Sequence, residues 1–439
     1  MSYARAGGVF DRVLSLLRPG AAGPMLLRVG GTSADDAYWE APTAGSPPWV
    51  FSIGDDWLRG LAGLARRDNL QVTLDLNLAV HSPAMAVRFA RAAYDALSPS
   101  RLAGLAIGNE PDLFEHQPGL ARERVGGAQS APRTDWTLSY SPTRYRHDYL
   151  TYARALEAGL PGVPLAGPES ASVTDGWLHA LDGMRGSGLT LLTVHRYPFS
   201  LCWAPDSPLY PRISSLLSES ASAGLADGLL PAIAHAHRSG LRLWVSEMNS
   251  VSCGGNQGVA DSFATALWAP DALFELMSHG VDGVNWHIRP GLLNAPFELH
   301  ASAIQPLPEL YGLALFGQML GPDARRVDVS VSETRGLHLK VWATRSSERT
   351  RVLLINKGAR AAAVSLLSTP AGTCGSLERL SASSIRSVDD VTLAGRPIGS
   401  DGRWLGRALL VTVCAHRGVY HVRVPRYSAV LLTQLGGAG

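Results

Sequence analysis

The chain has 439 residues, of which 46% are hydrophobic and 17% are charged, and its mean hydropathy is +0.05. The composition is typical of a globular protein, and the length indicates one large domain with a smaller one beside it, because single cores rarely grow this large. A formal net charge of +2 gives no electrostatic reason to expect a nucleic-acid partner. A pI of about 8.4 is at most permissive for an acidic substrate.

No apolar run reaches the length of a membrane span, so no membrane segment is expected. The first ten residues, MSYARAGGVF, contain one Arg and no long apolar core, unlike a secretion signal. A cytoplasmic location follows, unless the natural chain begins upstream and is secreted.

The four cysteines, Cys202, Cys253, Cys374 and Cys414, lack the spacing of a metal site and are too few for a disulfide scaffold. Cys374 and Cys414 could pair, which the sequence does not decide. No metal, nucleotide or flavin motif is present, so no metal and no cofactor are expected.

Apolar strands alternate with helices as far as about residue 320. The first helix is expected over Val9 to Leu17. Seven strands are expected to end at Val29, Leu76, Ile107, Ala166, Val194, Val245 and Trp286. This alternation predicts parallel βα units. In a β/α barrel, the carboxyl ends of such strands carry the catalytic groups.

The pattern changes from about residue 325 onward. Short alternating segments, such as 337–341, 352–354 and 411–413, are separated by Gly, Ser and Arg turns and lack helices between them. They predict an antiparallel β-sandwich. Gly321-Pro322 marks the boundary, so we expect a barrel domain over 1–321 and a sandwich domain over 322–439.

Residues 105–114, LAIGNEPDLF, contain the first candidate catalytic group. The apolar run is typical of a strand covered on both faces. Pro111 cannot continue a ladder and keeps Glu110 out of helical geometry. Glu110 is therefore expected at the carboxyl end of a strand, with Asn109 beside it. The alternative is a loop carboxylate that caps the next helix.

Residues 243–249, LWVSEMN, repeat the arrangement, with Glu247 at the end of an apolar strand. Two strand-end carboxyl groups are what retaining glycoside hydrolysis requires. One protonates the leaving oxygen, and the other attacks the anomeric carbon to form a covalent glycosyl-enzyme. The negative charge of Glu247 would help Glu110 to keep its proton until the first step, because like charges oppose ionisation.

At these motifs the sequence resembles glycoside hydrolase family 79, the β-glucuronidases and heparanases, within a larger clan of retaining (β/α)8 TIM-barrel hydrolases. The matching stretches are LLRVGGTSADDAYW (26–39), LAIGNEPDLF (105–114), VHRYP (194–198), SEMNSVSCGGNQGVADSFATALWAPD (246–271) and LYGLALFGQML (310–320), with a weaker match in RYSAVLLT (426–433). The resemblance implies a carbohydrate substrate, Glu110 as acid/base and Glu247 as nucleophile.

The resemblance also implies roles for neighbouring side chains. Asn109 stands where the clan places an amide on the sugar 2-hydroxyl, although it could simply turn the backbone. Tyr197, or His195 in its place, would hydrogen-bond the nucleophile and keep it ionised. The other strand ends supply candidate sugar contacts, with loop packing as the alternative; these are Thr32, Asp35, Asn77, Trp286 and His287.

The stretch after Glu247 bears on the substrate. Family members acting on uronic acids commonly carry an aromatic residue five positions after the nucleophile, followed by glycines. Here Ser252 takes that position, followed by Cys253 and Gly254. Consecutive backbone N–H groups can still bind the sugar carboxylate. The absent aromatic residue leaves two alternatives open: a clan relative that hydrolyses a neutral β-glycoside, or an inactive carbohydrate-binding relative.

Seven strands are one fewer than the eight that close this barrel. The missing strand is expected to be the first, because family members begin with a strand before the first helix and only Met1 to Ala4 stand there. We therefore expect that the natural chain starts upstream. A gap would then lie between the strands ending at Val29 and Trp286, with unpaired backbone groups along both.

Overall fold

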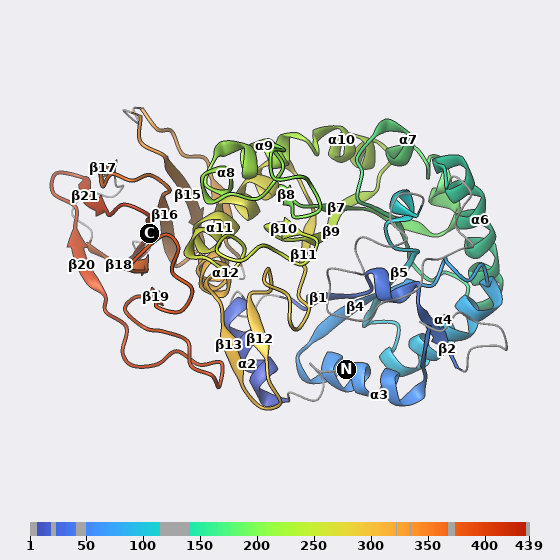
Figure 1. The fold of residues 1–439 in the computed structure, drawn as a ribbon. Coiled ribbons are helices and arrows are strands. Elements are labelled where there is room, and N and C mark those ends of the chain that lie inside the picture. Colours follow the sequence, from blue (N-terminus) through green and yellow to red (C-terminus); the bar gives the residue numbers. More distant parts are fainter. Residues whose placement is uncertain are drawn as a thin grey trace.

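The computed structural model describes residues 7–18, 23–40, 50–114, 140–321, 323–332, 336–367 and 374–435. In these residues the chain forms a barrel of parallel strands with helices around it, and an antiparallel domain beside the barrel (Figure 1). Among the helices described, none combines the length and the apolar character needed to cross a membrane.

Seven parallel strands form the barrel sheet in the order β1-β4-β5-β6-β7-β9-β11. Their bounds are β1 (Met25–Val29), β4 (Leu70–Leu76), β5 (Leu102–Ile107), β6 (Leu165–Ser170), β7 (Leu189–Arg196), β9 (Arg242–Met248) and β11 (Gly283–Trp286). β6 is buried at every position and β5 at all but one, as strands covered on both faces should be. The predicted barrel is confirmed.

The edge strands β1 and β11 approach each other without a backbone ladder among the described residues. The Asn285 side chain bridges them, because its Nδ2 donates to the Leu26 carbonyl at 3.0 Å. The sheet is thus a nearly closed barrel of seven strands, in agreement with the expected gap. Residues 1–6, which include the expected stub of an earlier strand, lie outside the described part of the chain.

The longer helices surround this sheet (Figure 1). Their bounds are α2 (Gly8–Leu17), α3 (Asp55–Arg67), α4 (Pro83–Leu97), α6 (Pro142–Gly159), α10 (Leu230–Arg238), α11 (Phe263–His279) and α12 (Pro308–Met319).

Helix α6 fixes the positions at which two barrel strands end. Its N-terminus at Pro142 is capped by Ser141, whose hydroxyl accepts the Arg144 amide of the first turn. On its buried face, the Tyr145 hydroxyl donates to the Ile107 carbonyl and the Tyr152 hydroxyl donates to the Asn77 carbonyl, each at 3.0 Å. These bonds satisfy carbonyls that leave the sheet at the ends of β5 and β4, next to the candidate site.

The C-terminal strands form two antiparallel sheets, so the predicted β-sandwich is confirmed. The large sheet has the order β14-β15-β16-β22-β18-β19, with β20 paired to β18, and the small sheet is β17-β21. The bounds are β14 (Arg325–Val327), β15 (Leu339–Arg345), β16 (Arg349–Asn356), β17 (Ala362–Leu367), β18 (Cys374–Ser381), β19 (Thr392–Leu393), β20 (Val411–Cys414), β21 (Val419–Val424) and β22 (Ser428–Leu435). The predicted boundary falls between α12 and β14, and Pro322 is outside the described residues.

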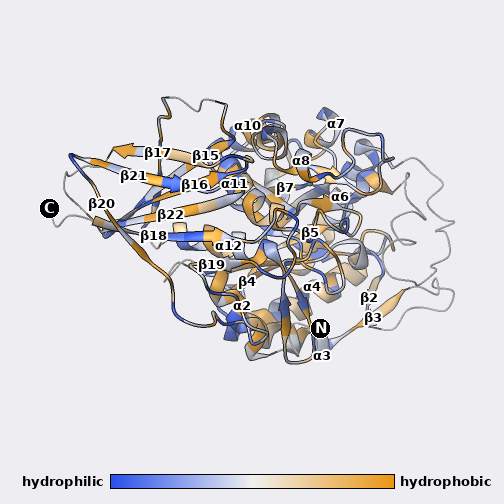
Figure 2. Cartoon of the chain, turned by 60° about the vertical axis from the view of Figure 1, so that its left-hand side comes forward, coloured by the Kyte–Doolittle hydropathy of each residue, from blue (hydrophilic) through white to orange (hydrophobic). Residues whose placement is uncertain are grey.

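Both faces of the large sheet are used for packing. On β16, Leu354 points toward the small sheet and packs with Tyr420 and Val430. The neighbouring Leu353 and Ile355 point the other way and join the core of the barrel. The sandwich strands accordingly carry both hydrophobic and hydrophilic segments (Figure 2).

A buried ion pair joins the two domains. Lys357, directly after β16, places its Nζ 2.5 Å from Oδ2 of Asp271 on α11, and both side chains are at most 1% exposed. The Trp342 indole donates to the other oxygen of Asp271 at 2.8 Å. Burial alone would raise the pKa of Asp271, but the charges of Lys357 and Lys340 lower it below its ordinary value. Asp271 is therefore ionised at neutral pH.

Replacing Asp271 by Asn should lower the free energy of unfolding by about 3–5 kcal/mol, because Lys357 would remain buried without its counter-charge. Urea denaturation measures this loss. The double variant Asp271→Leu/Lys357→Met should lose less, since it removes both charges. Asp328→Asn, at a side chain that is 91% exposed, is the control. A loss no larger than that of the control would contradict the assignment.

All four cysteines form disulfides. Cys374 and Cys414 stand opposite each other on β18 and β20, so the pairing that the sequence left open is present. Cys202 pairs with Cys253, which the sequence analysis did not predict. The two are 51 residues apart and meet because β8 (Phe199–Ser200) pairs with β10 (Val251–Ser252).

Candidate active site

Two glutamates meet at the carboxyl ends of β5 and β9. Glu110 follows β5, and Glu247 is the last residue but one of β9. One carboxylate oxygen of each, together with a ring nitrogen of His195, lies within 4.8 Å of the others. The side chains of Glu110 and Glu247 are 22% and 14% exposed, so both are accessible from solvent although mostly enclosed by protein.

A sharp turn brings Glu110 to this position. Gly108 has a φ of +84° and Glu110 a φ of +43°. A side chain at position 108 would be strained and would also overlap Leu78, whose Cδ2 is 2.7 Å from the Cβ position. The Glu110 amide donates to the Glu169 carbonyl at 2.9 Å, which holds the turn against the end of β6. Left-handed conformations of this kind in residues other than glycine concentrate at functional sites.

Both carboxylate oxygens of Glu247 accept hydrogen bonds. The Tyr197 hydroxyl donates to Oε1 and Arg28 Nη1 donates to Oε2, each at 2.8 Å. Burial opposes ionisation, but surrounding positive charge, that of His195 first, and these bonds hold the pKa of Glu247 well below its usual range. Burial lowers the pKa of the nearby His287, so Arg28 and His195 carry the positive charge at neutral pH.

Arg28 on β1 connects the acidic groups of the site. Its Nη2 donates to Asp75 Oδ2 at 2.6 Å and to Asn109 Oδ1 at 2.8 Å, and lies 3.2 Å from Glu169 Oε2. Burial opposes its charge, but Asp75, Glu169 and Glu247 together raise the pKa of Arg28 above its ordinary value. The pKa of Asp75 is raised to about 7, because the effect of burial exceeds the opposing effect of the Arg28 charge. One guanidinium therefore contacts side chains from four other strands or strand ends.

His195 bridges two carboxylates beneath the site. Its Nδ1 lies 2.9 Å from Glu110 Oε1 and its Nε2 lies 2.8 Å from Glu169 Oε2, and its side chain is 1% exposed. Burial disfavours the imidazolium, but the charge of Glu247 and the bonds to Glu110 and Glu169 raise the pKa of His195 to about 10. Of the two residues expected at the nucleophile, Tyr197 contacts Glu247, whereas His195 contacts Glu110.

The raised pKa of His195 predicts that both ring nitrogens stay protonated at a pH between 6.5 and about 10. The stability that this proton contributes should be complete below about 6.5 and lost as the pH rises through about 10. Nitrogen NMR of histidine-labelled protein measures the protonation, and His195→Gln identifies the signal. A His195 ring that loses its proton near 6.5 would contradict the geometry.

Asp35 and Asn77 shape the loops after β1 and β4. Asp35 Oδ1 accepts the amides of Leu78 and Ala79 at 3.1 and 3.2 Å. Asn77 Nδ2 donates to the carbonyls of Asp35 and Ala37 at 2.9 Å. Both side chains are buried. These contacts favour the loop-packing alternative over a direct sugar contact.

The remaining strand-end candidates differ in their surroundings. Thr32 is exposed and follows Gly31, whose Cβ position lies 3.9 Å from Glu247 Oε2. The Trp286 indole donates to Glu309 Oε2 at 2.9 Å. His287 Nδ1 is buried and has no hydrogen-bond partner in the described part of the chain.

The loop after Glu247 is fixed on both sides. Ser252 pairs with Ser200 through the β10-β8 ladder. Cys253 has a φ of +60° and is held by its disulfide, so its thiol is not free to contact a substrate. The Gly254 carbonyl accepts the Leu293 amide at 3.0 Å. The backbone amides of Cys253 and Gly254 are their candidate contacts to a sugar.

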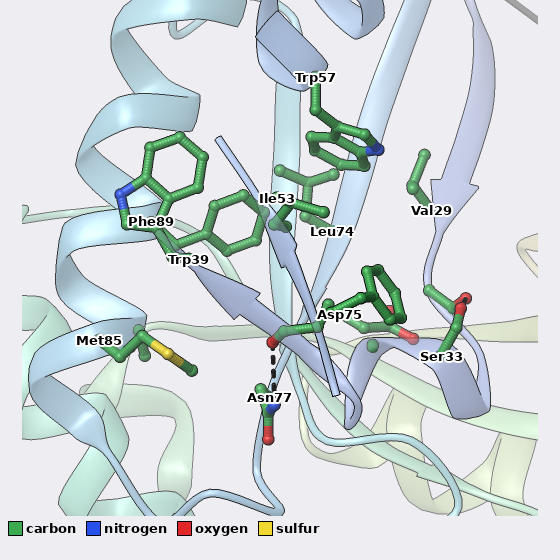
Figure 3. Close-up of a pocket in the computed structure, with 15 residues that line it drawn as sticks. Val29, Ser33, Trp39, Ile53, Trp57, Leu74, Asp75, Asn77, Met85 and Phe89 are labelled. Atoms are coloured by element: carbon green, nitrogen blue, oxygen red, sulfur yellow. Dashed lines mark hydrogen bonds between the residues drawn. The ribbon is translucent and has the colours of Figure 1, made fainter. Parts of the chain in front are cut away.

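A separate cavity of about 180 Å³ lies beside β1 and β4 and does not contain the glutamates (Figure 3). Aromatic side chains form much of its wall, and Asp75 reaches it from the Arg28 cluster. A side chain at Gly30 would overlap the Asp75 carboxylate, which comes within 1.8 Å of the Cβ position. The cavity is lined by Val29, Gly30, Ser33, Ala34, Ala37, Trp39, Phe51, Ile53, Trp57, Leu74, Asp75, Asn77, Met85, Ala86 and Phe89.

Arg28, Asp75 and Glu169 were not among the site residues expected from the sequence. Each lies in a strand that is otherwise mostly apolar, in LLRV, TLDL and GPES. A charged residue inside a strand covered on both faces must find a partner there, because an unpaired buried charge is very costly. That rule identifies these residues as a buried cluster, although it does not show which of them meet.

No protein-family model matches the sequence, and no curated protein is significantly similar to it. Solved structures share its fold. A 4-O-α-L-rhamnosyl-β-D-glucuronidase from Fusarium oxysporum superposes with a TM-score of 0.77 over 97% of this chain and 91% of that one, at 18% identity. A GH51 arabinofuranosidase from Xanthomonas axonopodis pv. citri gives 0.66 over 97% and 89%, at 13% identity.

A Paenibacillus polymyxa xyloglucanase from GH family 44 gives a TM-score of 0.64 over 94% of both chains, at 11% identity. The chain has the fold of these glycoside hydrolases. At such identities the similarity establishes the fold alone, so the resemblance to family 79 rests on the sequence motifs.

Proposed function

We propose that this protein is a retaining glycoside hydrolase, related to family 79, that cleaves β-linked uronic acid glycosides through a covalent glycosyl-enzyme. The observation that carries the proposal is the separation of the two carboxyl groups. Oxygens of Glu110 and Glu247 lie within 4.8 Å. Retaining enzymes separate these groups by about 5–5.5 Å, whereas inverting enzymes leave about 6.5–9.5 Å for a water molecule.

In the first step Glu247 attacks the anomeric carbon while Glu110 gives its proton to the glycosidic oxygen, so the C–O bond breaks and the aglycone leaves as an alcohol. The low pKa of Glu247 keeps this nucleophile ionised. Tyr197 and Arg28 hold its two oxygens, which fixes the orientation of the carboxylate. Little conformational entropy is then lost when the Glu247 carboxylate aligns with the anomeric carbon.

In the second step Glu110 takes a proton from water, and the hydroxide adds to the anomeric carbon as the bond to Glu247 breaks. The second step thus returns to Glu110 the proton that the first step gave to the leaving group. The His195 imidazolium holds Oε1 of Glu110 through both steps, so we assign the proton transfers to Oε2. His195 is thus a positioning residue for the acid/base.

Asn109 suits a bond to the sugar 2-hydroxyl. Its Oδ1 accepts from Arg28, which leaves the Nδ2 hydrogens as donors. A hydrogen bond donated to the sugar 2-hydroxyl oxygen strengthens as the oxocarbenium-like transition state forms.

Replacing Glu247 by Gln should abolish turnover of a nitrophenyl β-glucuronide, because the amide cannot form the glycosyl-enzyme. Glu110→Ala should keep some activity on this substrate, whose leaving group needs no proton, and lose it on alkyl glucuronides. NMR of the first product should show the β anomer. Glu157→Gln, at an exposed position on α6, is the matched control. An α product, or full activity of Glu247→Gln, would rule out the mechanism.

Three observations support a uronic acid at the cleaved position. The motifs resemble family 79, and a rhamnosyl-glucuronidase shares the fold. In addition, Cys253, Gly254 and Gly255 have φ values of +60°, +88° and +86°. This unusual backbone, fixed by the disulfide, can present successive amides to a carboxylate.

Ser252 favours a second candidate function, the hydrolysis of a neutral β-glucoside or β-xyloside. The side chain there cannot supply the phenol that uronate-specific relatives commonly carry. Nitrophenyl glucuronide, glucoside and xyloside, compared by kcat/KM, separate the two functions. No turnover of any of the three would favour the inactive carbohydrate-binding alternative.

Ser252→Tyr should raise the ratio of glucuronide to glucoside kcat/KM by about tenfold. The reason is that the free energy of one hydrogen bond to a charged group corresponds to roughly this factor. Ser252→Phe is the control that adds the ring without the hydroxyl. Equal ratios in the variant and the natural protein would show that this loop does not face the sugar carboxylate.

A further inference from the structure

A second cavity, of about 850 Å³, lies where α2 and α12 of the barrel meet the large sheet of the sandwich. Among the described residues that line it, five are arginines and Glu378 is the one acid. The arginines are Arg12, Arg18, Arg349, Arg351 and Arg403. The cavity shares no residue with the glutamate site. We call it the arginine groove.

The strand pattern of β16 explains why arginines gather here. Arg349, Arg351 and Leu353 alternate along the strand and therefore share one face. Leu353 is fully buried against the barrel. Toward the start of the strand this face is no longer covered, and there it carries the two arginines. Arg12 and Arg18 of the α2 segment form the opposite wall.

The charges of the groove are held in place but not cancelled. Arg12 donates to the Asp401 carbonyl and Arg18 to the Asp68 carbonyl, and neutral carbonyls orient a guanidinium without neutralising it. Arg403 lies 3.8 Å from the Asp401 carboxylate, with a side chain that is 69% exposed. An exposed pair at this distance contributes little.

The excess of positive charge in the groove is clearest at Arg351. Burial and the like charge of Arg349 lower its pKa, and the opposing effects of Glu378 and of Glu348 do not outweigh them. Burial raises the pKa of Glu378, which makes it a weaker counter-charge. An anion entering the groove would offset this excess of positive charge.

We propose that the arginine groove binds an acidic stretch of glycan, outside the catalytic centre. The inference rests on the proposed function, because a hydrolase of uronic-acid glycans meets chains that bear repeated carboxylates. Guanidinium groups bind carboxylates through paired hydrogen bonds. Leu410, an exposed side chain, also lines the groove and offers apolar surface to sugar rings. The volume is within the range of ligand sites, about 300–1,000 Å³.

The test measures binding of a hyaluronan oligosaccharide, which has a carboxylate on every second sugar, by titration calorimetry. Glu247→Gln serves as the background so that no turnover occurs. Adding Arg349→Ala/Arg351→Ala should weaken binding about tenfold or more, because two charged contacts are lost. The matched control, Arg423→Ala/Arg426→Ala, removes the same charge from exposed positions on and after β21 and should change binding less than about twofold.

Further ligands distinguish the sources of binding. A chitin oligosaccharide of equal length should not bind the groove, and single-stranded DNA should bind more weakly than hyaluronan. Arg349→Glu, at an exposed side chain, provides a second variant should the double variant fold poorly. In enzyme with Glu247 intact, the double variant should turn over nitrophenyl glucuronide normally and show a raised KM for a polymeric substrate.

Unchanged hyaluronan binding in both arginine variants would overturn the inference, as would equal binding of chitin or preferred binding of DNA. These outcomes are separate from failure of the proposed function. A protein that hydrolyses no glucuronide would refute that function, while the calorimetric comparison would still decide whether the groove binds acidic glycan.

Discussion

The candidate site depends on one buried cation. Arg28 on β1 is buried, and its guanidinium bonds or faces Asp75, Asn109, Glu169 and Glu247. Without it, several carboxylates would share a small buried volume, and each would be driven to protonate. With it, Glu247 keeps its charge although it is largely enclosed. The cation therefore makes an ionised nucleophile compatible with a buried site.

His195 holds Glu110 in place, as Arg28 holds Glu247. It connects Glu110 to Glu169, and Glu169 in turn faces Arg28. The two candidate catalytic carboxyl groups thus belong to one network of hydrogen bonds and ion pairs. Burial makes each pair in such a network costly to break. The spacing between the carboxyl groups is set by this network as well as by the barrel strands.

The sandwich does more than cover one side of the barrel. Its large sheet contributes Leu353 and Ile355 to the barrel core, and the Lys357–Asp271 pair joins the two domains. Where that same sheet face extends past the barrel, Arg349 and Arg351 line an open groove. One strand therefore both attaches the sandwich and forms part of the proposed glycan surface.

The sequence by itself determined the order of the barrel strands and the sandwich, and it indicated Glu110 and Glu247 as candidates, because an apolar run that ends in a polar residue is a local pattern. Its strand ends were approximate, since β6 continues past Ala166 to Ser170. Only the tertiary structure decided that Arg28, rather than a strand-end side chain alone, organises the site. It also decided that Cys202 meets Cys253. These contacts join residues from different strands, and which strands face one another across a barrel depends on how the sheet curls, which no local pattern records.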